Sequence, residues 1–231
     1  MKRVTLFALV AMSLMMISCV NVRLGKQKET QVKQVNEVIT LEMFDKIDVC
    51  GEMQVTYSPG EAYSVVVDAP ADAFKQLAIY VDRGHLCIET KSEFQSLESS
   101  DMSQVKVQVT SPVIKDFEVK GSGSLTTNEL NTDENLAVKL TGSGAITFST
   151  LSCNKIDADL TGSGNITISK LQAKEIESDV TGSGNITYEY AQAERALSKV
   201  TGSGQVMLSG AVTKHEESVT GSGQVDTSGL Q

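Results

Sequence analysis

The sequence contains few of the residues from which catalytic and metal-binding sites are commonly built. Two histidines occur among 231 residues, His85 and His215, and neither lies in a recognisable catalytic motif. No Cys-x-x-Cys pair and no Cys/His spacing indicates a zinc site. We therefore expect no catalytic residues, no bound metal and no cofactor.

Cysteine is also scarce. Beyond Cys19 there are three cysteines, Cys50, Cys87 and Cys153, and an odd number cannot form a complete disulfide framework. Cys50 and Cys87 fall in expected strands of one region, so a single disulfide in an oxidising periplasm and two small buried side chains are both open. Cys153 shares a repeat position with Ala173, which predicts a structural role for its thiol.

Basic residues are outnumbered by acidic ones. The chain has 20 lysines and arginines against 29 aspartates and glutamates, which gives a net charge of −9. Phosphate contacts need clustered lysine and arginine side chains, so we expect no nucleic-acid partner.

Long apolar runs are absent after the first residues. Residues 4–17 form an apolar stretch of fourteen residues that follows Lys2 and Arg3. This stretch is too short to span a bilayer and is typical of an export signal, which we place at residues 1–18. Residues 16–19, Met-Ile-Ser-Cys, resemble the lipobox of bacterial lipoproteins, in which the cysteine is acylated. Cys19 is therefore the predicted lipidation site, and an ordinary secretory signal cleaved near Ser18 is the open alternative.

A polar segment follows the predicted signal. We expect residues 19–40 to be a tether between a lipid anchor and the folded part, because residues 20–38 contain one glycine and no aromatic residue. The membrane is then a partner through this anchor, and the protein is expected to be an exported outer-membrane lipoprotein. Residues 20–23 lack the acidic run expected of a lipoprotein sent to the outer face. Attachment facing the periplasm is thus the default, with the cell surface as the alternative.

Glycine, by contrast, is abundant and regularly placed. Six Gly-Ser-Gly triplets recur at spacings of 21, 20, 20, 20 and 19 residues, which is the signature of a stacked repeat architecture. We expect their glycines to be structural corners, since glycine adopts positive φ without steric cost and allows close stacking. These corner glycines are Gly121, Gly123, Gly142, Gly144, Gly162, Gly164, Gly182, Gly184, Gly202, Gly204, Gly221 and Gly223. The serines between them are expected to hydrogen-bond from one unit to the next.

Between the triplets, apolar and polar residues mostly alternate, which is the period of a β-strand. One unit cannot bury its own apolar side, whereas stacked units can. The sequence therefore predicts an all-β fold, a β-solenoid (parallel β-helix) with rungs of about twenty residues over residues 120–231. Residues 41–119 are β-rich without a visible period and are expected to cap the solenoid. Within them, residues 47–56 match residues 117–126, which indicates a degenerate early rung. No cap is apparent at the other end, so end-to-end homo-oligomers are a hypothesis.

Two sets of residues carry a resemblance to a known family. Residues 44–51, Phe-Asp-Lys-Ile-Asp-Val-Cys-Gly, continue into Gln54, Val55 and Gly60, and the x-Gly-Ser-Gly units follow. Over residues 41–230 the chain resembles the putative auto-transporter adhesin, head GIN domain family, whose members are common as exported proteins of Bacteroides-type bacteria (Bacteroidetes). The resemblance implies a fold that contains a β-solenoid. It provides no established catalytic residues.

The most distinctive charged feature is acidic. Asp157, Asp159, Glu177 and Asp179 fall in two outward columns of adjacent rungs, flanked by Lys139 and Lys199. Like charges at strand spacing are unfavourable unless a cation or solvent screens them. A weak divalent-cation or ligand site and an ordinary solvated acidic face are the two interpretations, and the second is favoured.

These features predict a non-enzymatic cell-envelope lipoprotein whose β-solenoid surface binds glycan or protein partners in the manner of an adhesin. One alternative is a carbohydrate-active enzyme that uses the acidic face around Asp159 and Asp179. The other is a structural envelope component whose ends assemble.

Overall fold

The computed structural model describes residues 34–39, 41–91 and 101–231. The predicted signal peptide (1–18), the predicted lipidation site Cys19 and most of the predicted tether lie outside these residues. The tether is predicted to reach residue 40, but residues 34–39 form strand β1 (Gln34–Ile39), which pairs antiparallel with β4 (Ser64–Pro70). Ile39 packs against the hydrophobic core, so this part of the segment folds instead of linking.

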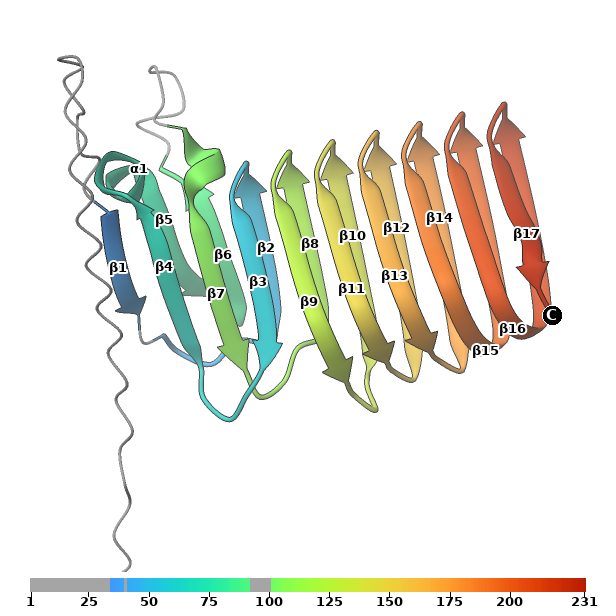
Figure 1. Cartoon of the computed structure of the whole chain (residues 1–231), viewed down its shortest axis with the longest axis horizontal. Helices are drawn as coiled ribbons and strands as arrows, with labels where there is room; N and C mark the ends of the chain where they lie inside the picture. Colours follow the sequence, from blue (N-terminus) through green and yellow to red (C-terminus); the bar gives the residue numbers. More distant parts are fainter. Residues whose placement is uncertain (1–33, 40, 92–100) are drawn as a thin grey trace, which may run out of the picture. The chain divides into compact units, whose positions relative to one another are not determined.

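Strands dominate the described residues, which contain seventeen of them together with a six-residue helix, α1 (Ala71–Gln76), and a 3-10 turn, η2 (Met102–Gln104) (Figure 1). The remaining strands are β2 (Lys46–Gly51), β3 (Gln54–Pro59), β5 (Leu77–Asp82), β6 (His85–Thr90), β7 (Lys106–Ser111), β8 (Asp116–Gly121), β9 (Ser124–Asn131), β10 (Asn135–Gly142), β11 (Ala145–Ser152), β12 (Lys155–Gly162), β13 (Asn165–Gln172), β14 (Glu175–Gly182), β15 (Asn185–Gly202), β16 (Gln205–Gly221) and β17 (Gln224–Leu230).

The strands form two sheets that face each other across the core. Sheet 1 contains, in spatial order, β5, β6, β2, β8, β10, β12, β14 and the second halves of β15 and β16. Sheet 2 contains β1, β4, β7, β3, β9, β11, β13, the first halves of β15 and β16, and β17. Apart from β1, β4 and β5, neighbouring strands are parallel. This stack of about six turns confirms the predicted β-solenoid.

Each repeat unit makes one rung with two corners. The Gly-Ser-Gly triplet carries the chain from sheet 1 to sheet 2, since β12 ends at Gly162 and β13 begins at Asn165. The return corner between β13 and β14 consists of residues 173–174. Gly142 lies opposite Gly162, and Gly162 opposite Gly182, so the triplets stack in register along one side of the solenoid.

The N-terminal region builds rungs in an order that differs from the sequence. β2 pairs with β8 so that Asp48 lies opposite Glu118 and Gly51 opposite Gly121, which confirms the match between residues 47–56 and 117–126. The rung of β6 and β7 lies on the other side of β2 and β3. The earliest rung in the sequence is therefore enclosed by two later ones. Strands β4 and β5, joined by α1, then run antiparallel to β7 and β6 and close this end.

The hydrophobic core lies between the two sheets. Equivalent positions of successive rungs stack there, and Ile146 and Ile166 are fully buried. Phe117 of β8 contacts Tyr57 of β3 and Phe148 of β11, with ring centroids 5.2 and 5.5 Å apart. These aromatic contacts cross between the sheets and join the β2–β3 rung to the repeat units.

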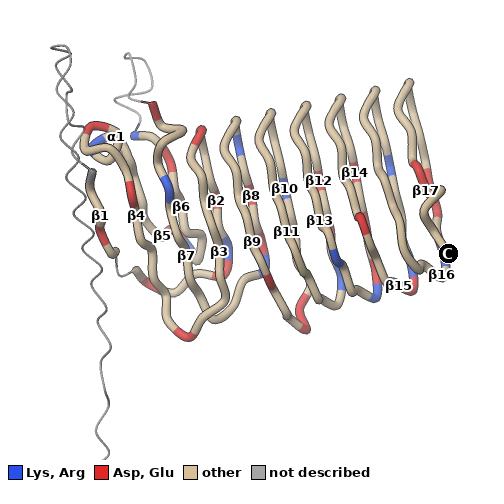
Figure 2. The backbone as a smooth tube through the Cα atoms, in the orientation of Figure 1, with Lys and Arg blue, Asp and Glu red and all other residues tan. Residues whose placement is uncertain are grey.

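Charged side chains of both signs occur along the stack (Figure 2). Within the part of the chain that the structure describes, no helix is long and apolar enough to cross a membrane.

Candidate functional site

The predicted acidic residues come together on the outside of sheet 1. Asp157 of β12 lies opposite Glu177 of β14, and Asp159 lies opposite Asp179. Lysines bracket the second pair, because Lys139 of β10 is the other neighbour of Asp159 and Lys199 of β15 is the other neighbour of Asp179.

The bracketing lysines and Lys155 compensate part of this negative charge. Lys155 Nζ donates a hydrogen bond of 2.7 Å to Glu177 Oε2, which lowers the pKa of that carboxyl. Lys199 Nζ lies 3.8 Å from Glu177 Oε1. Asp159 has a raised pKa instead, chiefly because it is partly buried and then because Asp157 and Asp179 lie beside it. The four carboxylates are thus unequal.

Glycoside hydrolysis uses two carboxyl groups that face each other across the substrate, and a carboxylate group can also bind a cation. Among the described residues, however, no group of three or more histidine, cysteine, aspartate or glutamate side chains is placed to hold a metal ion. The arrangement fits a ladder of mixed charge that helps to fix strand register, with two like-charged steps, Asp157 opposite Glu177 and Asp159 opposite Asp179.

The Gly-Ser-Gly corners are filled by the backbone of the neighbouring rung. Gly142 has a φ of +122°, and a Cβ added there would overlap the carbonyl oxygen of Gly121. The amides of Ser143 and Gly144 both donate to that oxygen, at 2.9 and 3.0 Å. The same pair of bonds recurs from rung to rung.

The serine side chains behave differently from the expectation. Their hydroxyl groups point to solvent, and none of them makes a hydrogen bond within the described residues. The bonds between successive corners come from backbone amides instead. The corner amides are already occupied by a carbonyl oxygen, so the corner has no free backbone donors for a ligand.

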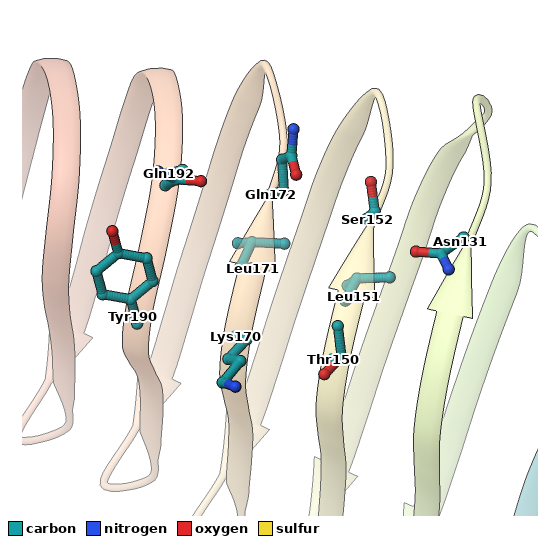
Figure 3. A pocket seen from close by; sticks show the side chains of 9 residues that line it. All are labelled: Asn131, Thr150, Leu151, Ser152, Lys170, Leu171, Gln172, Tyr190 and Gln192. Carbon is teal, nitrogen blue, oxygen red and sulfur yellow. The ribbon is translucent and has the colours of Figure 1, made fainter.

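A groove on the outside of sheet 2 is the feature that sequence reasoning missed (Figure 3). It has a volume of about 280 Å³ and crosses strands β9, β11, β13 and β15. Its lining residues are Asn131, Thr150, Leu151, Ser152, Lys170, Leu171, Gln172, Tyr190 and Gln192. A second groove, around the return corner, shares Ser152, Gln172 and Gln192 with it.

The groove arises from a bend that recurs in strands β9, β11, β13 and β15 of sheet 2. In β13 two successive residues, Ser169 and Lys170, face outward before the buried Leu171. In β15 the corresponding pair is Glu189 and Tyr190. The bend interrupts the alternation of inward and outward side chains and separates two outward columns. Between these columns lie Leu151 and Leu171, which line the groove but are almost completely buried.

Strand β16 ends this pattern. In β16 one outward residue, Ser209, lies between two buried residues, whereas β15 has two outward residues at this place. The register between β15 and β16 shifts here. This missing residue accounts for the 19-residue spacing between the last two triplets. Tyr190 therefore has no bulky neighbour in the next rung, and its side chain is 48% exposed. The irregular spacing and the lone tyrosine in a polar column are the sequence signals that could have revealed the groove.

The three cysteines within the described residues, Cys50, Cys87 and Cys153, are free thiols. Cys50 lies opposite Glu89 and Cys87 opposite Asp48, so the two cysteines are diagonal neighbours and form no disulfide. Burial raises the pKa of Cys153 to about 12, in agreement with the expected structural role.

The sequence matches a known protein family over most of the described residues. The family profile described as "Putative auto-transporter adhesin, head GIN domain" matches residues 43–170 and 159–231. No curated protein matches the chain.

Several crystal structures are similar to the chain. A putative lipid binding protein from Parabacteroides distasonis is 21% identical with a TM-score of 0.68, over 85% of this chain and 97% of that one. A putative adhesin from Bacteroides fragilis is 21% identical with a TM-score of 0.68, over 84% and 97%. Another putative adhesin, this one from P. distasonis, is 19% identical with a TM-score of 0.53, over 85% of this chain and 98% of that one. At these sequence identities, the similarity shows a shared fold and nothing about a shared function.

Proposed function

Because the chain belongs to the putative auto-transporter adhesin, head GIN domain family, we propose that it is a non-enzymatic protein of the bacterial cell envelope that binds a partner through the outside of its β-solenoid. The partner is a glycan or a protein. The anchor in this proposal is a lipid on Cys19, which holds the protein at the outer membrane with the periplasmic face as the default and the cell surface as the alternative.

The observation that supports binding rather than scaffolding alone is the groove on sheet 2. The corner amides bond to the neighbouring rung, Tyr188 in the core bonds to Ser178, and Lys155 on sheet 1 pairs with Glu177. The groove departs from this pattern, since it combines an exposed tyrosine with amide side chains that have no partner among the described residues. Exposed polar and aromatic groups of this kind mark recognition surfaces.

The binding role is tested in bacteria that produce the full chain and in a deletion strain. Retention of the cells is measured on surfaces coated with purified polysaccharides, mucin or extracellular-matrix proteins. If the protein is surface-exposed and adhesive, deletion lowers retention several-fold on at least one coating. Equal retention of both strains on every coating, together with no bound partner for the purified chain, would contradict the proposal.

The anchor has its own measurement. Metabolic labelling with radioactive palmitate is expected to label the wild-type chain and not the Cys19→Ala variant. Digestion of intact cells by an added protease then separates the two membrane faces, because only surface-exposed protein is cleaved. Label that persists in Cys19→Ala would show that this cysteine is not the lipidation site.

A carbohydrate-active enzyme is the competing function, and the raised pKa of Asp159 beside Asp179 is the observation that favours it. It predicts release of reducing sugars from a polysaccharide, with and without calcium, that disappears in a double variant, Asp159→Asn with Asp179→Asn. Such turnover would replace the binding proposal.

A structural envelope component is the remaining alternative. Regular parallel strands can pair with strands of another copy, so this function predicts end-to-end assembly. Light scattering that finds only monomers over a wide concentration range would count against it.

A further inference from the structure

We propose that the groove on sheet 2 is a carbohydrate-binding site in which Tyr190 stacks on a sugar ring and Gln172 and Gln192 bind its hydroxyl groups. The inference deepens the proposed binding function and rests on it. It assigns that function a location and one class of ligand, a glycan.

The shape of the groove suits a chain that lies across the strands. Its residues come from four successive strands of sheet 2, and three strand-to-strand steps of about 4.8 Å span about 14 Å. One wall is the column of Thr150, Lys170 and Tyr190, and the other is the column of Ser152, Gln172 and Gln192 (Figure 3). The groove is open to solvent along this length.

The side chains of the groove match the two kinds of surface that a sugar presents. A pyranose ring has a face of C–H groups, which packs on the apolar face of an aromatic ring, and Tyr190 is 48% exposed. Its rim carries hydroxyl groups that both donate and accept hydrogen bonds. A glutamine amide does the same, with one acceptor oxygen and two donor hydrogens.

The amides of the groove are available for this purpose. Within the described residues, Gln172 and Gln192 make no side-chain hydrogen bond, and the ammonium group of Lys170 forms no ion pair. Asn131, at the far end, is engaged by Glu129, to which its Nδ2 donates at 3.0 Å. Binding is therefore expected to centre on the β13–β15 half of the groove.

Other ligand classes fit these residues less well. A peptide that binds as an added strand needs a free sheet edge, but β11 and β13 are paired on both sides. A lipid chain needs exposed apolar surface, whereas Leu151 and Leu171 are only 1% and 2% exposed. A nucleic acid needs clustered cations, and Lys170 is the one cation in the groove.

The test uses the full-length chain, purified in detergent, on an array that carries immobilised glycans and, as separate spots, envelope and matrix proteins. We expect the wild-type chain to bind at least one glycan. Tyr190→Ala should weaken that binding by about tenfold or more, the effect of losing a central aromatic contact. Tyr190→Phe keeps the ring and should stay within about threefold.

Two further variants complete the comparison. Tyr80→Ala removes another exposed tyrosine, 43% exposed on β5, and should leave glycan binding unchanged. The double variant of Gln172→Ala and Gln192→Ala should weaken binding at least as much as Tyr190→Ala. Circular dichroism of each variant confirms that the solenoid is intact.

A direct reporter is available because the chain contains no tryptophan. Tyr190→Trp places a single indole in the groove, and the glycans that bind on the array should change its emission with the same concentration dependence as binding. Unchanged emission at saturating glycan would place the ligand elsewhere.

The outcomes separate this inference from the proposed function. Glycan binding that survives Tyr190→Ala overturns the site but leaves a binding protein. A protein partner bound on the array, with no glycan bound, overturns the ligand class and leaves the proposed function standing. Both the site and the proposed function are contradicted if two results coincide. The purified chain then binds nothing on the array, and deletion of its gene does not change the retention of the cells.

Discussion

At the scale of the residue, the corner glycines are constrained more by the neighbouring rung than by their own turn. The backbone of Gly142 has positive φ, and the space where its Cβ would lie holds a carbonyl oxygen that accepts two amides. A side chain at this position therefore meets strain and a steric overlap at once, and it also displaces two hydrogen bonds.

This predicts opposite outcomes for two adjacent substitutions. Gly142→Ala should lower the free energy of unfolding by about 2 kcal/mol or more, because strain at a glycine-only conformation adds to the overlap. Ser143→Ala should change it by less than about 0.5 kcal/mol, since the hydroxyl is exposed and makes no bond. Urea unfolding followed by circular dichroism measures both. An equal decrease in the free energy of unfolding for both variants would show that the Ser143 hydroxyl stabilises the fold.

The residue scale also shows how far the sequence leads. Positive φ and close stacking at the triplets could be predicted, because only glycine permits both. The donor of the hydrogen bonds between rungs could not. The serine hydroxyl and the backbone amides of a corner lie close together, so the sequence does not show which of them donates a hydrogen bond to the carbonyl oxygen of the neighbouring rung.

At the scale of the element, two neighbouring outward columns of sheet 1 each contain a carboxylate whose pKa is shifted, and the two shifts have opposite directions. Asp159 has a raised pKa because it is partly buried and faces Asp157 and Asp179, so its ionised form destabilises the fold. Glu177 has a lowered pKa because Lys155 donates to it, so its ionised form stabilises the fold.

Neutral variants of these carboxylates should therefore differ in sign. At pH 7 Asp159→Asn is expected to raise the free energy of unfolding by about 0.2–1 kcal/mol, and Glu177→Gln to lower it by a similar amount. The gain in Asp159→Asn shrinks as the pH falls through the raised native pKa and is gone below about pH 3.9. The loss in Glu177→Gln persists to about pH 4.3 and fades only below it, through the lowered native pKa.

Urea unfolding at several pH values between 7 and 3 follows both variants against the wild type. Asp157→Asn serves as a further control, because it removes a neighbour of Asp159 and should reproduce part of the gain. A destabilising effect of Asp159→Asn at pH 7 would instead indicate that this carboxylate has a favourable partner, such as a bound cation.

The strands themselves were predictable, whereas their bends were not. Alternating residues such as Ile166 and Ile168 identify the inward side of β13, and these positions are buried as the alternation requires. The pair Ser169 and Lys170 breaks that alternation, and in a sequence such a pair is indistinguishable from a strand end. The groove depends on this pair, so it became visible only with the register of neighbouring strands.

At the scale of the whole described solenoid, aromatic contacts join the N-terminal rungs to the repeats. Phe117 is fully buried between Tyr57 and Phe148, which belong to rungs on either side of it. Stacked rungs stabilise mainly their neighbours, so such a contact determines whether the two regions unfold as one unit.

Phe117→Ala should therefore lower the free energy of unfolding by about 3–5 kcal/mol, the cost of a large cavity in a core. Hydrogen exchange measured by mass spectrometry should show protection lost in β2–β3 and in β10–β11 together. Val113→Ala, at a 43% exposed position, is the control and should change stability by less than about 0.5 kcal/mol. Loss of protection in β2–β3 alone would show that the N-terminal rungs unfold independently.

The order of rungs is the part of the architecture that the sequence conceals. Residues 47–56 could be recognised as a rung from their match to residues 117–126. Their enclosure between β6–β7 and β8–β9 could not, because a buried parallel strand of valines and isoleucines offers equivalent edges on both sides.

The in-register stacking of identical units makes the length of the protein a quantity that gene duplication can adjust. A second copy of residues 161–180 would bring its own corner carbonyl, corner amides and bend, so every bond between rungs would be reproduced without altering its neighbours. Each added copy would lengthen the groove by one strand spacing, about 4.8 Å. The number of units then acts as a ruler for the length of ligand that the surface can contact.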